Sequence, residues 1–322
     1  MELRKYFQDN TSKIFRCHNN VEFVSLEKIP KSFFSYFGKS DFFLIRISSK
    51  GITYSYVGKV TSEKEYLFIK ELWDMHYFKS TRFRIPKPIS FIEKFNLLVM
   101  EKVEGDNLKS LILDEIYTFS NEEFSDKFML GLEASIDWLV DFEIRFYKKN
   151  HCDYDTFFEQ TRKEFNGLSV PKKFKRYLAK ELSSSSLITD KIPIKLSNRN
   201  FRSRDIMINS EEVVRFDWNR WKDKENFIFL EASSFINELN SFFLYPLANK
   251  AKLQSIKLLF LELYFAKSIF KDYKFLFNTI HSYFQLWVVK RTLSEYLKER
   301  NFFRKRFLKS RIENYFGEKF YV

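Results

Sequence analysis

Glycine, cysteine and histidine are scarce in this chain, and each shortage excludes a class of functional site. Only 7 of the 322 residues are Gly, well below the usual ~7%. No GxGxxG or GxxxxGKS/T pattern occurs, which excludes the glycine-rich phosphate loops of dinucleotide-binding and Walker-type proteins. The two Cys and four scattered His provide neither a disulfide framework nor the ligand spacing of a zinc site, and they indicate a reducing compartment.

Long apolar runs are lacking too. No stretch reaches the roughly 18–20 uncharged residues that would span a bilayer. The first ten residues, MELRKYFQDN, lack the apolar core of a secretory signal peptide. We therefore expect a cytoplasmic protein.

Basic and apolar residues are abundant. Lys and Arg total 55 against 42 Asp and Glu, for a formal net charge of +13, and 45% of the residues are hydrophobic. That apolar content suffices for a core and excludes a disordered chain. The positive charge suits an anionic partner, whether a nucleic acid, an anionic membrane surface or a phosphorylated ligand.

The period of the apolar residues changes along the chain and predicts an α+β fold with two lobes. Short alternating runs predict strands over 33–37, 42–47, 52–60, 89–92 and 97–101, with a helix over 61–77. After Gly105, helical periodicity predominates over 108–113, 128–147, 158–165, 172–182 and from 229 onward, with a break near Pro246. Strand signals recur only at 192–196, 205–208 and 213–216. We expect an antiparallel-sheet lobe over 1–103 and a helical lobe over 104–322.

Residues 195–218 carry the most informative pattern. A strand leads into a polar loop containing Asn200, Asp205 follows five positions later, and Asp217-Trp218 ends a third strand twelve positions after Asp205. This spacing resembles the catalytic loop and metal-binding strand of the aminoglycoside phosphotransferase and choline-kinase-like family, which reads His-Gly-Asp, four residues, Asn, an apolar run and Asp-Trp. We expect the segment to form one hairpin.

Other landmarks of that family follow in the same order. Lys59 ends a strand, and Glu65 lies in the next helix, although Glu63 competes with Glu65 as its partner. Residues 85–89, Ile-Pro-Lys-Pro-Ile, resemble a Val-Pro-x-Pro turn. Residues 97–108 look like a hinge that ends in Gly-x-x-Leu. Residues 138–142 resemble a Leu-x-x-Leu-His helix, with Glu143 where a His is common.

The resemblance implies a bilobal protein-kinase-like fold and a set of roles. Lys59 and Glu65 would hold nucleotide phosphates, with Arg199 and Arg204 nearby, and Glu101 and Val103 of the hinge would contact the cofactor. Asp205 and Asp217 would bind Mg²⁺ through hard oxygen ligands. The implied reaction moves the γ-phosphoryl of ATP to a hydroxyl of a small acceptor such as an amino alcohol, a sugar or an aminoglycoside.

One substitution breaks the family pattern. The positions of His-Gly-Asp read Asn198-Arg199-Asn200, so an amide stands where the base Asp is expected. An amide orients a hydroxyl but accepts no proton at neutral pH, and loss of a general base typically costs ~10²–10⁴ in rate. Three hypotheses remain open: an atypical or impaired kinase, a pseudokinase that binds or scaffolds, and a basic binder that keeps only the fold.

Three further features have simpler interpretations. His151-Cys152-Asp153 imitates a catalytic motif, but no metal ligand follows at the required spacing, so we expect an ordinary loop. Cys17-His18 lacks a third group and is interpreted as incidental. The basic tail, residues 298–311, holds seven Lys or Arg and one acid. It fits a packed amphipathic final helix, an anionic membrane contact or a nucleic-acid contact.

Overall fold

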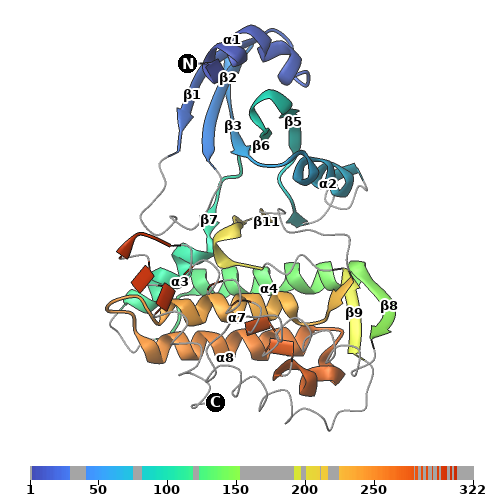
Figure 1. Cartoon of the computed structure of the whole chain (residues 1–322), viewed down its shortest axis with the longest axis vertical. Coiled ribbons are helices and arrows are strands. Elements are labelled where there is room, and N and C mark those ends of the chain that lie inside the picture. The colour runs from blue at the N-terminus through green and yellow to red at the C-terminus, as the bar shows by residue number, and fades with distance from the viewer. Residues whose placement is uncertain are drawn as a thin grey trace. The chain divides into compact units, whose positions relative to one another are not determined.

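The computed structural model (Figure 1) consists of two units formed by non-contiguous segments. It describes residues 2–29, 41–74, 82–118, 123–152, 192–196, 201–210, 212–216 and 225–278, and between 280 and 309 it describes 280–281, 284–285, 288, 292, 296, 299–302, 305–306 and 308–309. Unit 1 comprises Met1–Leu108 and Arg204–Trp221, and unit 2 comprises Lys109–Ser203 and Lys222–Val322. The sequence predicts a boundary at residue 103 and places 195–218 in the helical part, whereas the contacts group 204–221 with the first unit.

Unit 1 contains a five-stranded antiparallel sheet in the order β1-β2-β3-β6-β5. Its strands are β1 (Val21–Lys28), β2 (Phe42–Ser49), β3 (Ile52–Val60), β5 (Pro88–Ile92) and β6 (Leu97–Glu101). The strands predicted over 42–47, 52–60, 89–92 and 97–101 are confirmed, while the one predicted over 33–37 lies outside the described residues. Alternating side chains give each strand two faces, and the helices cover them differently.

The first face carries a helix that the sequence analysis did not identify. α1 (Glu2–Ile14) packs Phe7 and Ile14 on Ile45, Ile47, Tyr56 and Val99 of the sheet. Phe7, Thr11 and Ile14 are buried, and Leu3 and Tyr6 pack against the same cluster. These residues recur at helical spacing, so the sequence does carry a local signal for this helix. Packing on the sheet stabilises this helix more than its own sequence does.

The second face carries α2 (Glu63–Asp74), within the helix predicted over 61–77. α2 buries Glu65, Ile69 and Leu72 and lies next to β5 (Figure 1). Cross-strand register places Lys59 opposite Phe42 and Leu98, and it places Tyr56 opposite Ile45 and Glu101. Because successive residues of a strand point to opposite faces, Lys59 lies on the second face and Tyr56 on the first.

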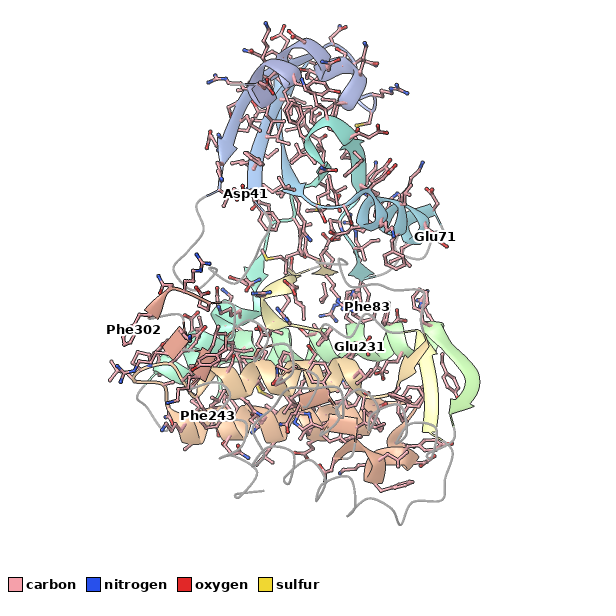
Figure 2. All side chains as sticks on the ribbon, viewed as in Figure 1. Asp41, Glu71, Phe83, Glu231, Phe243 and Phe302 are labelled. Carbon is pink, nitrogen blue, oxygen red and sulfur yellow. The ribbon has the colours of Figure 1, made fainter. Side chains whose placement is uncertain are left out.

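A second sheet in unit 1 has the order β4-β11-β10-β7. Its strands are β4 (Phe83–Arg84), β11 (Val213–Arg215), β10 (Ile206–Ile208) and β7 (Asp106–Asn107). β4 runs parallel to β11, and the other pairs are antiparallel. Phe83 of β4 is labelled in Figure 2. A 3₁₀ turn, η3 (Ser203–Asp205), precedes β10.

The prediction that residues 195–218 form one hairpin is wrong. β9 (Ile192–Leu196) belongs to a separate antiparallel sheet, between β8 (Tyr147–Cys152) and β12 (Glu225–Phe227). β8 and β12 satisfy both edges of β9, so β9 has no edge left for β10. The hairpin consists of β10 and β11 alone. The prediction of a loop at His151 and Cys152 is also wrong, because both residues belong to β8.

Unit 2 is mostly helical. Its helices are α3 (Leu108–Tyr117), α4 (Asp126–Phe146), α7 (Leu230–Phe242), α8 (Lys250–Lys267) and the 3₁₀ helix η4 (Lys271–Leu276). α4, α7 and α8 lie side by side (Figure 1), and the chain between α7 and α8 includes Pro246, as predicted. The helices predicted over 158–165 and 172–182 lie outside the described residues.

Aromatic side chains form the core of the helical unit. Phe235 stacks on Phe260 with ring centroids 4.3 Å apart, and Trp138 stacks on Phe142 at 5.3 Å. Glu231, at the start of α7 (Figure 2), is fully buried among these helices. No helix in the described part of the chain has both the length and the apolar character needed to cross a bilayer.

Candidate functional site

Lys59 and Glu65 form a buried ion pair. Lys59 Nζ lies 2.8 Å from Glu65 Oε1, and each residue is 3% exposed. The hydroxyl of Thr61 donates a hydrogen bond to the other carboxylate oxygen, Oε2. Glu63, the competing candidate, lies exposed at the start of α2. The structure therefore brings together Lys59 and Glu65, which the family resemblance pairs, and leaves Glu63 exposed.

The location of this pair distinguishes it from a surface salt bridge. Lys59 shares its face of the sheet with Leu98 and Met100, which are 0% and 3% exposed. Burying two charges costs several kcal/mol of desolvation per ion, which their attraction offsets only with good geometry and further hydrogen bonds. Thr61 supplies such a bond. The arrangement fixes one ammonium group on the sheet at a defined position.

The side chain of Glu101 lies on the opposite face from Lys59, because Glu101 pairs with Tyr56 across β3 and β6. Its Oε1 accepts hydrogen bonds from Arg84 Nη2 at 2.8 Å and from the backbone N–H of Lys87 at 2.9 Å. Arg84 also bonds Glu212. Partial burial by itself would lower the pKa of Arg84. The carboxylates of Glu101 and Glu212 outweigh this effect and raise the pKa of Arg84. Arg84 of β4 thus connects the Glu101 carboxylate of β6 with Glu212, the residue that precedes β11.

β6 ends at Glu101, and Val103 lies in the hinge that follows. The backbone N–H and C=O of Val103 make no hydrogen bond to any residue that the structure describes, whereas the C=O of Glu104 accepts one from Asn209 Nδ2 at 3.2 Å. Gly105 has a φ of +146°, and a Cβ there would lie 2.9 Å from the carbonyl carbon of Ile208. Only glycine permits this close approach. The approach therefore explains why Gly stands at the first position of the Gly-x-x-Leu pattern.

Asp205 lies at the junction of η3 and β10. It is 9% exposed, and its Oδ1 lies 3.6 Å from Arg204 Nε. Its backbone C=O accepts a 2.7 Å hydrogen bond from the N–H of Phe216, the residue that precedes Asp217 in the sequence. Asn200, Arg199 and Asp217 lie outside the described residues, so their predicted roles stay predictions.

In unit 2, the loop before η3 is held by packing and by one carboxylate. Phe201 is fully buried, with its ring 6.2 Å from that of Trp138 and 5.9 Å from that of Phe235. The backbone N–H of Ser203 donates to Glu238 Oε2 at 2.6 Å. These two contacts fix the chain at positions four and two residues before Asp205.

Glu143, at the position where the resembling family often has His, is a core residue. Its carboxylate oxygens accept hydrogen bonds from the Tyr264 hydroxyl at 2.8 and 3.0 Å. Burial and, secondarily, the Glu143 carboxylate raise the pKa of Tyr264 well above its usual range. This buried contact joins α4 to α8.

Several site residues escape sequence reasoning: Thr61, Arg84, Asn107, Glu212 and Glu238. Their partners lie 4, 17, 97, 128 and 35 residues away along the chain. Only Thr61 has a local signal, since it lies close to Glu65 and is a helix-cap residue type. The remaining contacts depend on the tertiary fold.

The donor chemistry fits a magnesium ion held jointly with a nucleotide. Mg²⁺ is usually bound through one or two carboxylates plus substrate phosphates. Asp205 would supply one carboxylate for such an ion, and Asp217 of the sequence would supply a second. Within the described residues, no group of three or more His, Cys, Asp or Glu could hold a metal by itself.

Solved structures share the fold of this chain. A thermostable mutant of aminoglycoside phosphotransferase APH(4)-Ia, in ternary complex with AMP-PNP and hygromycin B, matches with a TM-score of 0.58 and 11% identity over 100% of both chains. A glucosamine kinase in complex with glucosamine, ADP and inorganic phosphate matches with a TM-score of 0.56 and 12% identity, covering 94% of this chain and 81% of that chain. Amicoumacin kinase hAmiN in complex with AMP-PNP, Ca²⁺ and Ami gives 0.53 and 11% identity, covering 98% and 95%.

Sequence comparison adds no closer relative, because no family model and no curated protein matches the chain. The likeness therefore concerns the fold. Its antiparallel sheets and helices confirm the α+β class expected from the sequence. This chain has the kinase-like fold that aminoglycoside phosphotransferase, glucosamine kinase and amicoumacin kinase share.

Proposed function

We propose that this chain binds ATP with Mg²⁺ and acts as a phosphotransferase on a hydroxyl of a small molecule, with catalysis weakened by Asn200. The buried Lys59–Glu65 ion pair carries the proposal. In phosphoryl transfer, a lysine on a strand neutralises phosphate oxygens while a helix glutamate holds its ammonium in place. The chain places these residue types on β3 and α2.

The acceptor class follows from the proteins that share the fold. They were solved with hygromycin B, glucosamine or Ami, each together with a nucleotide. All three comparisons concern kinases of small molecules, so an amino alcohol, an amino sugar or an aminoglycoside is the first acceptor class to test. Asp205 and Asp217 would hold the metal, Arg199 and Arg204 would approach phosphates, and Val103 would contact the nucleotide at the hinge.

Asn200 favours a second candidate, a pseudokinase that binds nucleotide without transferring phosphate. Loss of a general base typically costs ~10²–10⁴ in rate, so replacement of the base predicts a severe rate loss. Positioning and metal charge supply most of phosphoryl-transfer catalysis, so the replacement does not require complete inactivity. Activity that appears on Asn200→Asp in an otherwise inert protein would favour this second candidate.

In the basic tail, residues 298–311, the described apolar residues differ in burial. Leu308 is 1% exposed, whereas Phe302 is 69% exposed. The hypothesis of a basic membrane-surface or nucleic-acid binder predicts salt-sensitive binding that is lost when 298–322 is deleted. Retention of that binding after the deletion would contradict it.

A nucleotide thermal-shift assay tests the proposed function. AMP-PNP should raise the Tm of the full chain, more so with Mg²⁺, and Asp217→Ala should abolish the Mg²⁺-dependent part. Asp9→Ala, which changes an exposed Asp on α1, serves as the matched control and should respond as wild type does. No shift in wild type with either nucleotide or metal would refute nucleotide binding. Transfer of labelled phosphate from ATP to amino sugars then separates kinase from pseudokinase.

A further inference from the structure

One amide side chain holds the backbone on both sides of Asp205. Asn107 lies in β7, where it pairs with Met207 of β10. Its Nδ2 donates to the carbonyl of Arg204 at 2.9 Å and to the carbonyl of Ile206 at 3.2 Å. The same nitrogen lies 3.6 Å from Met207 Sδ. The two carbonyls belong to the residues immediately before and after Asp205.

The chemistry of asparagine matches this task. Its NH₂ group provides two donors, and two backbone carbonyls accept from it here. The opposite amide orientation would bring a carbonyl oxygen against two other carbonyl oxygens, so the contacts also determine the orientation of the side chain. Together with the bond from Phe216 N–H to Asp205 C=O, three consecutive carbonyls, at 204, 205 and 206, have defined donors.

The linker that carries Asn107 is itself fixed on β10. Gly105 allows the linker backbone to approach Ile208 closely, and Asn209 donates to Glu104 C=O at 3.2 Å. Two asparagine amides therefore connect the hinge linker with the β10–β11 hairpin. Asn107 acts next to Asp205, whereas Asn209 acts four residues beyond it.

We propose that Asn107 is a positioning residue that sets the orientation of Asp205 for binding a divalent cation, an inference that rests on the proposed function. Mg²⁺ demands near-ideal octahedral geometry at about 2.0–2.1 Å, so a ligand must be held in place. Asp205 ends a single 3₁₀ turn, and such a short element provides little rigidity by itself. Loss of an outer-shell hydrogen bond of this kind typically reduces metal affinity about 10–100-fold.

Three variants separate hydrogen bonding from packing. Asn107→Leu keeps the branched shape, adds no charge and removes both donors. Asn107→Ser keeps one donor and should give an intermediate effect. Asn209→Ala removes the other amide that connects the same two segments and serves as the control.

The first readout is the Mg²⁺ concentration that gives half of the metal-dependent thermal shift with AMP-PNP. Asn107→Leu should raise this concentration about 10–100-fold and leave the metal-free nucleotide shift unchanged. Asn209→Ala should lower the Tm without moving the Mg²⁺ midpoint. An unchanged midpoint in Asn107→Leu, or an equal change in Asn209→Ala, would overturn the proposal.

The second readout is hydrogen–deuterium exchange of the apo protein, which needs no bound nucleotide. The peptide that contains Phe216, whose N–H donates to Asp205 C=O, should exchange faster in Asn107→Leu than in Asn209→Ala. Equal exchange in the two variants would show that Asn107 does not fix this loop. If wild type gives no thermal shift but exchange follows this order, the proposed function fails while the positioning of Asp205 by Asn107 holds.

Discussion

Removing one partner of the Lys59–Glu65 pair should destabilise the protein more than removing both. Glu65→Leu leaves the Lys59 ammonium at 3% exposure without its carboxylate at 2.8 Å. Breaking a buried pair in this way costs about 3–5 kcal/mol, whereas replacing both partners with apolar residues of similar volume is often neutral or stabilising. We expect Lys59→Met to cost a similar amount. We expect Lys59→Met/Glu65→Leu to lie within about 2 kcal/mol of wild type, a range that includes the acceptor lost by the Thr61 hydroxyl.

The assay is urea denaturation of the full chain, followed by circular dichroism and by tryptophan fluorescence. Coincident transitions justify a two-state free energy of unfolding. The control is Lys28→Met, because Lys28 and Asp41 form an ion pair of similar length, 3.0 Å, with side chains 58% and 35% exposed. Exposed pairs contribute at most about 1 kcal/mol. Single-variant costs that simply add in the double variant, or a Glu65→Leu cost no greater than that of Lys28→Met, would refute the reasoning.

Two further predictions concern the hinge and the helical unit. Gly105→Ala should lower the free energy of unfolding by at least about 2 kcal/mol, because it combines backbone strain with a clash against Ile208. The control is Gly51→Ala, at φ +77° with no atom within 4 Å of the added Cβ, which should cost only about 1–2 kcal/mol. Equal costs of the two variants in urea denaturation would contradict the role of the close approach. Glu115 lies 2.8 Å from Lys252 in unit 2, with side chains 7% and 8% exposed. Burial alone would raise the pKa of Glu115, but hydrogen bonds and the Lys252 charge outweigh burial and lower it below its usual 4.5. Because the folded pKa is depressed, the stabilisation is complete above the unfolded pKa and is lost as the pH falls through the folded pKa. The cost of Glu115→Gln should therefore be largest at pH 7 and shrink in acid, as urea midpoints at several pH values would show; a cost that is independent of pH would exclude the charge as its source.

The sequence by itself determined the local elements and the order of the site. Alternating apolar residues predicted β2, β3, β5 and β6, and helical spacing predicted α2 and α4, because these periods are set within windows of about ten residues. The family resemblance implied that Lys59 pairs with an acidic residue of the next helix, and the structure shows the pair with Glu65.

Only the tertiary structure decided which distant segments share an edge or a hydrogen bond. Nothing near β9 in the sequence indicates that β8 and β12 occupy its two edges, so the expected hairpin over 195–218 divided between two sheets. Asn107 and Arg204 are 97 positions apart, and Arg84 and Glu212 are 128 apart. A local pattern carries no information about partners at such separations, because the packing of whole strands and helices selects them.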